Sequence, residues 1–185
     1  MAPARARPWT RAWLAWASRG EGLGENARWL IGRHLAEVER LRGELRLVEA
    51  RLRDWAAADA LVRRLLACPG VGLVTAAALR AEVGDFDRFR TGKQLARYLG
   101  LSPRNASSGP RQADAGVIRA GSPYVRALVV QLAHRLARAE PRWRQLAQSL
   151  RRRGKPGSVI AAAVANRWAR RLHYDLTRAP QTPAA

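Results

Sequence analysis

The segment LLACPGVGLVTAAALRAEVG, residues 65–84, contains a short turn between two apolar runs. The turn is PGVG, residues 69–72. On both sides of it, apolar residues recur at intervals of three and four, which is the spacing of one helix face. Pro69 ends the first helix, and the two glycines permit backbone angles that other residues resist. The segment therefore predicts two helices joined by a tight turn.

This pattern has two interpretations. In a helix-hairpin-helix, glycine amides at a helix N-terminus face a nucleic-acid phosphate, and Gly70 and Gly72 would supply those amides here. An ordinary helical hairpin with no ligand would have the same residues. The turn alone leaves both interpretations open.

The charge of the chain favours the first interpretation. Its 185 residues have a formal net charge of +20 and a pI near 11.8. Residues 86–185 contain 20 of the 34 lysines and arginines but four of the 14 acids, so most of the excess follows the turn. So large an excess indicates a polyanionic partner, DNA or RNA, with an acidic membrane surface as a less favoured alternative.

Several classes of site are excluded by composition. The single cysteine, Cys68, rules out an intramolecular disulfide and a cysteine-based zinc site. The three histidines lack the spacing of metal ligands, so we expect no metal site in this chain. No stretch approaches the length of a transmembrane helix, and no signal-peptide cleavage pattern follows the N-terminal arginines. We expect a soluble, reduced, cytoplasmic protein that binds no membrane.

Helical periodicity recurs through most of the chain, and Ala, Leu and Arg dominate it, which predicts an all-α fold. The expected parts are an N-terminal leader of uncertain role, a coiled-coil helical arm, a compact helical domain with the helix-hairpin-helix, and a disordered tail. Their boundaries are residues 1–25, 26–64, 65–176 and 177–185.

The leader places Trp9, Trp13 and Trp16 on one helix face. Packing against a core is the favoured interpretation, and membrane-interface binding or a disordered, vestigial leader are the alternatives.

The arm has apolar residues three and four apart from Ile31 to Trp55, with His34 as a polar point in this seam. Glu49 and Arg53 have the i, i+4 spacing of an ion pair. The seam either pairs with a second copy or folds back on its own chain, and we expect a homo-oligomer formed through residues 26–64. We also expect this helix to continue to the turn at Pro69. The seam residues are Ile31, His34, Val38, Leu41, Leu45, Val48, Leu52 and Trp55.

A polar loop, SPRNASSGPRQADAGVIRA, occupies residues 102–120. It follows a short helix capped by Thr91, and its far end allows a β-hairpin. Arg104, Arg111 and Arg119 make it basic. Long polar loops inside compact domains are common places for functional sites.

Two further basic features follow the loop. Ser122 and Pro123 begin a helix on which Arg126 lies off the apolar face. RRRGK, residues 151–155, is the densest basic cluster; such runs are often only solvated surface, but the adjoining arginines favour phosphate contact. The full set of expected nucleic-acid contacts is Gly70, Gly72, Arg104, Arg111, Arg119, Arg126, Arg151, Arg152, Arg153 and Lys155.

Few residues have a pattern typical of catalysis. No pair of acids is arranged for metal-dependent phosphoryl transfer, and no Ser-His-Asp triad can be argued from spacing. Ser107 and Ser108 lie within the basic loop, where arginines could stabilise charge on an attacked phosphate. Taken alone, Ser-Ser-Gly is a common loop sequence.

Six short motifs follow one another in a fixed order: PGVG at 69–72, DFDRF at 85–89, GLSP at 100–103, SG at 108–109, RAG at 119–121 and VR at 125–126. Over roughly residues 60–136 this series resembles the C-terminal domain of insertion-sequence transposases of the 110, 116 and 902 family. The heptad helix is similar to the coiled-coil connector of that family.

The resemblance implies DNA transposition by site-specific recombination. A loop serine in the family attacks the DNA backbone, and a guide RNA transcribed from the element selects the DNA. Ser108, the serine immediately before glycine, is the matching position, and Ser107 is the less favoured substitute. DNA and a guide RNA are the partners that the resemblance implies.

The chain also departs from the family pattern. The family has an N-terminal ribonuclease-H-like domain with four acids that bind magnesium, whereas residues 1–25 contain only Glu21 and Glu25. Ile118 and Arg119 stand where the family has serine and lysine. We therefore expect a truncated or mis-started chain with no cofactor of its own, magnesium being bound only with the missing domain. The alternative function is a non-catalytic DNA- or RNA-binding remnant.

Overall fold

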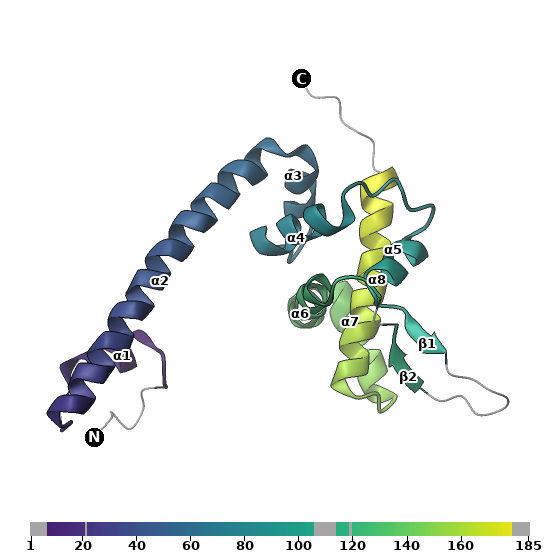
Figure 1. The fold of residues 1–185 in the computed structure, drawn as a ribbon. Coiled ribbons are helices and arrows are strands. Elements are labelled where there is room, and N and C mark those ends of the chain that lie inside the picture. The colour runs from purple at the N-terminus through teal and green to yellow at the C-terminus, as the bar shows by residue number, and fades with distance from the viewer. Residues whose placement is uncertain (1–6, 21, 106–113, 119, 179–185) are drawn as a thin grey trace. The chain divides into compact units, whose positions relative to one another are not determined.

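The computed structural model describes residues 7–20, 22–105, 114–118 and 120–178 (Figure 1). Eight helices and one two-stranded sheet lie within them, so the predicted all-α fold is confirmed. The chain divides into an N-terminal unit, Met1–Asp54, and a C-terminal unit, Trp55–Ala185. The helices are α1 (Arg11–Arg19), α2 (Glu25–Ala58), α3 (Ala60–Leu66), α4 (Leu73–Val83), α5 (Gly92–Tyr98), α6 (Pro123–Ala139), α7 (Pro141–Arg152) and α8 (Gly157–Arg178), and the strands are β1 (Pro103–Asn105) and β2 (Asp114–Val117).

Helix α1 carries two of the three tryptophans of the predicted face. It begins after Thr10, whose hydroxyl accepts a hydrogen bond from the Trp13 amide at 3.3 Å. The Trp13 ring lies 5.2 Å from that of Trp9, which precedes the helix, and 6.2 Å from that of Trp16. The tryptophans thus pack on one another, although Trp9 is still 69% exposed.

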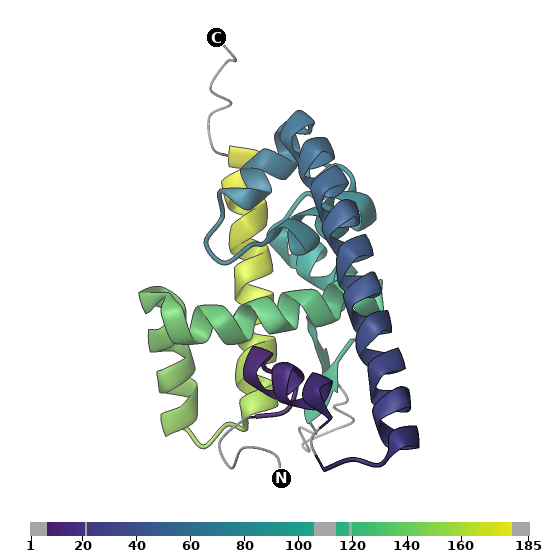
Figure 2. The same ribbon diagram turned by 90° about the vertical axis from the view of Figure 1, so that its left-hand side faces the viewer.

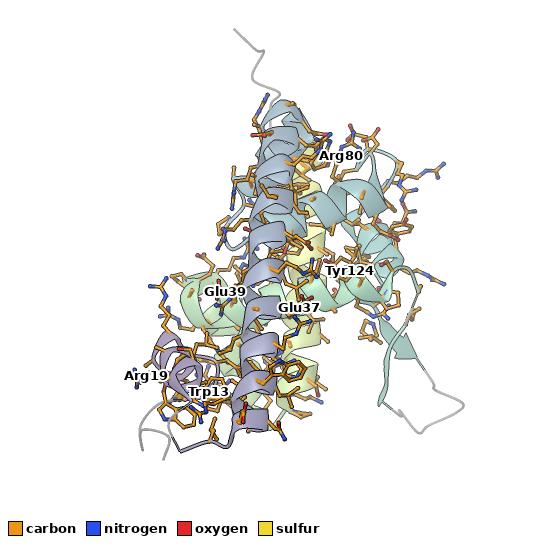
Figure 3. All side chains as sticks on the ribbon, turned by 60° about the vertical axis from the view of Figure 1, so that its left-hand side comes forward. Trp13, Arg19, Glu37, Glu39, Arg80 and Tyr124 are labelled. Carbon is orange, nitrogen blue, oxygen red and sulfur yellow. The ribbon has the colours of Figure 1, made fainter. Side chains whose placement is uncertain are left out.

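Helix α2 is 34 residues long and is stabilised along its surface by ion pairs. Arg40 pairs with Glu37 at 2.6 Å and also with Glu44, and the bond from Arg40 lowers the pKa of Glu37. Figure 3 shows Glu37 and Glu39 projecting from this helix. The predicted pair of Glu49 and Arg53 is present, with 3.1 Å between Oε2 and Nη2.

Large apolar side chains of the seam lie on the surface of α2. Leu41, Leu45 and Val48 are 49%, 57% and 64% exposed. The long amphipathic helix that the heptads predict is therefore present. Its pairing with a second copy stays a prediction.

The prediction that this helix continues unbroken to Pro69 is wrong. Asp59 adopts an extended conformation, with φ −89° and ψ 115°, which ends α2 at Ala58 and lets α3 begin at Ala60. The Asp59 carboxylate accepts from the Val62 amide at 3.0 Å and from Arg80 Nε at 2.8 Å. Asp59 thus caps α3 and joins it to α4, so the chain turns where apolar periodicity alone indicated one helix.

The core of the C-terminal unit is built around α8. Ile160, Val164, Trp168 and Leu172 follow one another at intervals of four, which is the spacing of one helix face, and all four are buried. Helices α5, α6 and α7 all pack on α8, while α4 packs on α6 and α3 on α4. Figure 2 shows α6 crossing α8, and Figure 1 shows α5 further along the same helix. Because α5, α6 and α7 all contact α8, polar side chains from these helices lie close to those on the surface of α8.

Replacing Asp59 with alanine removes the cap and the ion pair together. We expect this change to lower the free energy of unfolding by about 1–2 kcal/mol, measured by urea titration. Asp59→Asn is the matched variant, because it retains an oxygen for the Val62 amide but has no charge for Arg80. It should cost less than the alanine.

The same residue predicts a pH dependence. The Val62 amide, and then Arg80, lower the pKa of Asp59 in the folded chain. Its contribution is therefore present above the unfolded pKa of about 3.9 and is lost as pH falls through the lower folded value. The stability difference between wild type and Asp59→Asn should be smaller at about pH 2.5 than at about pH 6. An equal difference at both would contradict this role.

Candidate nucleic-acid interface

The turn between α3 and α4 gives its two glycines different surroundings. Gly70 has φ +77°, and a Cβ there would lie 2.9 Å from Leu132 Cδ1 and 3.0 Å from Leu136 Cδ2. Its carbonyl accepts from Arg135 Nη2 at 3.2 Å. Gly70 thus sits against α6, and its left-handed backbone conformation, together with this packing, explains why a glycine is present there.

Gly72 is open. No atom lies within 4 Å of the position a Cβ would take, and the residue is exposed. It is the N-cap of α4 and supplies no side-chain hydrogen bond to the first turn of that helix. A phosphate could therefore approach the backbone at Gly72 without meeting a side chain of this residue.

The polar loop begins and ends at one place. β1 and β2 are antiparallel, with Asn105 opposite Asp114 and Pro103 opposite Val117. The expected β-hairpin is present, but its strands flank the loop instead of lying at its far end. Asn105 and Asp114, which flank residues 106–113, are thus held side by side.

The base of this hairpin is fixed by a close crossing of two backbone segments. At Gly100, with φ +68°, a Cβ would lie 2.3 Å from the Ala120 carbonyl oxygen, and at Gly121, with φ +67°, one would lie 2.2 Å from the Tyr98 carbonyl oxygen. Arg126 Nη1 donates to the Ala120 carbonyl at 3.0 Å. The crossing holds the hairpin against the end of α5 and the start of α6.

A second bond ties the hairpin to α8. Asn166 Nδ2 donates to the Leu101 carbonyl at 3.2 Å, and Leu101 is buried. The Ile118 amide donates to the Ser102 carbonyl at 2.8 Å and extends the pairing of the strands toward the crossing. The segments on both sides of the loop are therefore bonded to neighbouring helices, through Arg126 of α6 and Asn166 of α8.

The predicted catalytic residue, Ser108, lies outside the described residues, as do Arg111 and Arg119. Arg104 is described only as part of the β1 backbone. Arg126 is described fully and lies at the base of the loop.

The basic cluster at residues 151–155 forms the turn between α7 and α8. Gly154 has φ +70°, and the Lys155 amide donates to the Leu150 carbonyl at 3.1 Å, which ends α7 in a tight left-handed turn. Arg151, Arg152, Arg153 and Lys155 are all exposed. The turn thus presents four cationic side chains within five residues.

One basic surface was not predicted. A groove of about 1030 Å³, the α7–α8 groove, is formed by residues 87–93 with α7 and α8. Six cationic side chains line it: Arg90, Lys93, Arg142, Arg167, Arg170 and Arg171. A signal was available, because Arg167, Arg170 and Arg171 have the i, i+3, i+4 spacing of one helix face.

The described residues offer little other chemistry. They contain no group of three or more His, Cys, Asp or Glu side chains close enough to hold a metal ion. Burial raises the pKa of the Cys68 thiol, which suits a packing residue better than a reactive thiolate. No helix in this described part is long and apolar enough to cross a bilayer.

Residues 62–148 match the family model described as the transposase IS116/IS110/IS902 family. The match begins in α3 and ends within α7. It includes the turn between α3 and α4, the β-hairpin and the polar loop.

Curated relatives agree with this match. A "Probable family 20 transposase" of Pseudomonas aeruginosa is 36% identical over 147 residues, covering 77% of this chain and 43% of that protein. The "Transposase for insertion sequence element IS1111A" of Coxiella burnetii is 36% identical over 90 residues, 49% of this chain and 25% of that protein. The "Transposase for insertion sequence element IS1328" of Yersinia enterocolitica is 31% identical over 126 residues, 66% of this chain and 38% of that protein. The chain thus spans less than half the length of these relatives.

The backbone crossing can be tested by adding one methyl group. Gly121→Ala strains a left-handed residue, which costs about 1–2 kcal/mol, and forces apart a packed backbone, which costs about 1–3 kcal/mol more. Gly116→Ala is the matched control, because Gly116 has φ +75° but no atom within 4 Å of its would-be Cβ. In urea titrations Gly121→Ala should lose markedly more stability than Gly116→Ala. Equal losses would contradict the crossing.

Proposed function

This chain belongs to the transposase IS116/IS110/IS902 family, matched over residues 62–148, and on that premise we propose that it is the nucleic-acid-binding, C-terminal part of such a transposase. It would act in DNA transposition by site-specific recombination. The observation that carries the proposal is the match itself, because the matched residues include both the turn between α3 and α4 and the polar loop.

Charge supports DNA as the partner. The chain has a net charge of +20, and basic side chains gather at the α7–α8 turn. Exposed arginines and lysines bind phosphates and release counterions, so binding should weaken as salt increases. Gly72 and the start of α4 would add backbone amides to the contact. A guide RNA, the second partner, would be held by the same kind of contact.

Ser108 is the proposed nucleophile. Its Oγ would form a bond to a DNA phosphorus while the bond from that phosphorus to a deoxyribose oxygen breaks. The hydroxyl proton leaves the serine, and the departing oxygen takes up a proton. The β-hairpin supports this role, because its strands hold Asn105 and Asp114, the residues that flank the loop, side by side. Magnesium would be held by a four-acid domain outside this chain.

The second candidate function is a DNA- or RNA-binding module without chemistry. The exposed basic turn at residues 151–155 favours it, because phosphate binding there requires no serine. Both candidates bind nucleic acid and differ in whether a covalent adduct forms.

We further propose that the chain forms a homo-oligomer through α2. The apolar seam supports this proposal, because side chains such as Leu45 and Val48 are exposed on a helix whose other faces carry ion pairs. Heptad seams of this kind gain stability by packing against a second helix.

The covalent step predicts a trapped adduct. Incubating the chain with nicked or junction DNA should give a DNA–protein adduct that survives denaturing gels. Ser108→Ala should abolish the adduct, because no other atom replaces Oγ, whereas Ser107→Ala should retain it.

The assay is run with the chain alone and with the N-terminal part of the Pseudomonas aeruginosa relative supplied in trans. An adduct with wild type and Ser107→Ala only would support the nucleophile. Salt-sensitive binding without an adduct in either condition would contradict it and leave the binding module.

The oligomer can be tested by placing a charge in the seam. Leu45→Glu should convert an oligomer to a monomer in light scattering after gel filtration, because a carboxylate in an apolar interface is costly to bury. Leu47→Glu is the matched control, since Leu47 lies on the same helix, is 73% exposed and is outside the seam. A monomeric wild type, or equal effects of the two variants, would refute pairing through α2.

A further inference from the structure

The α7–α8 groove concentrates positive charge on one face of the C-terminal unit. Its cationic side chains come from residues 90 and 93, the start of α7 and the C-terminal half of α8. Asp87 is the carboxylate that also lines it, and Asp175 pairs with Arg171 at 2.7 Å. Six cations against these two carboxylates leave four positive charges around one open groove.

Close contacts between residues that line the groove fix its shape. A Cβ at Gly92 would lie 2.7 Å from the Arg170 carbonyl oxygen, so α5 approaches the α8 backbone closely. His173 Nε2 lies 2.7 Å from the Phe89 carbonyl oxygen; since a carbonyl only accepts, the ring donates this bond. These contacts fix the segment with Arg90 and Lys93 beside the arginines of α8.

Arginines of this groove lie at the surface and not in an internal network. Arg90, Arg142, Arg167 and Arg170 are exposed, and the one ion pair described for the lining is that of Arg171 with Asp175. Like charges gathered in this way repel one another and favour an anionic ligand. The guanidinium groups can each bind phosphate oxygens with two parallel hydrogen bonds.

We propose that the α7–α8 groove binds the phosphodiester backbone of a nucleic-acid strand, as a contact site separate from the 151–155 turn. The inference rests on the proposed function and adds a surface to it. An extended polyanion suits the arrangement better than a single small anion, because the cations come from three segments and line a groove open to solvent.

The groove and the basic turn lie at opposite ends of α7. Arg142 is in the first turn of that helix and Arg151 in the last, which separates them by about 14 Å along the axis. A strand has one phosphate charge per about 3.4 Å of helix axis, so one nucleic acid could contact both surfaces. The two sites can therefore be tested by separate substitutions.

The test uses the full chain and fluorescence anisotropy with three labelled probes of one sequence: single-stranded DNA, duplex DNA and single-stranded RNA. Arg167→Ala/Arg170→Ala removes two groove charges, and Arg33→Ala/Arg46→Ala removes two exposed charges of α2 as a matched control. We expect the groove variant to bind about tenfold more weakly and to reduce the slope of log K against log salt by about two, with little change in the control.

Lys93→Glu, on another element, should weaken binding in the same way, and unchanged thermal unfolding of each variant shows that the fold is retained. The probe whose affinity falls most identifies the kind of strand. If wild type binds but the groove and control variants bind equally well, the groove inference is overturned and the proposed function stands. If wild type binds none of the probes, both fail.

Discussion

The close approach of α5 to α8 at Gly92 is the constraint on which the C-terminal unit depends. A side chain there would meet the backbone of Arg170, so the two helices can touch only because the residue is glycine. This contact places one end of α5 beside the basic face of α8. The other end leads through Tyr98 and Gly100 to the backbone crossing at Gly121, from which the polar loop begins. The Gly92 contact therefore positions one side of the groove, and the crossing at Gly100 and Gly121 positions the base of the β-hairpin.

Features that depend on local sequence could be predicted. The buried face of α8 follows from apolar spacing, and Thr91 and Ser122 cap their helices through bonds three residues away. Features that depend on distant segments could not. The ion pair of Asp59 with Arg80 joins residues 21 positions apart, and the groove requires charges from three segments to meet. The glycine requirement at Gly92 and Gly121 comes from backbone distances that no local pattern contains.

The turn at residues 69–72 shows why one motif can have two interpretations. Gly70 packs on α6 and is explained without a ligand, whereas Gly72 leaves the start of α4 open. An ordinary helical hairpin is also compatible with Gly72, because this residue is the N-cap of α4 and glycine is common at that position. The proposed nucleic-acid contact would fall on the amides at the start of α4, where the backbone at Gly72 is open, and not on those beside Gly70.

An arginine-rich composition by itself can reflect nothing more than codon usage, so the arrangement of the charges is the stronger evidence for a polyanionic partner. On α2 the arginines alternate with glutamates and form ion pairs within a turn of the helix. After residue 85 the acids are few, and the cations gather at the α7–α8 turn and in the groove. If the arginines had no functional role, glutamates that neutralise them would be expected after residue 85 as well as on α2. Leaving clustered charges without acids costs stability through repulsion, and an anionic ligand removes that cost.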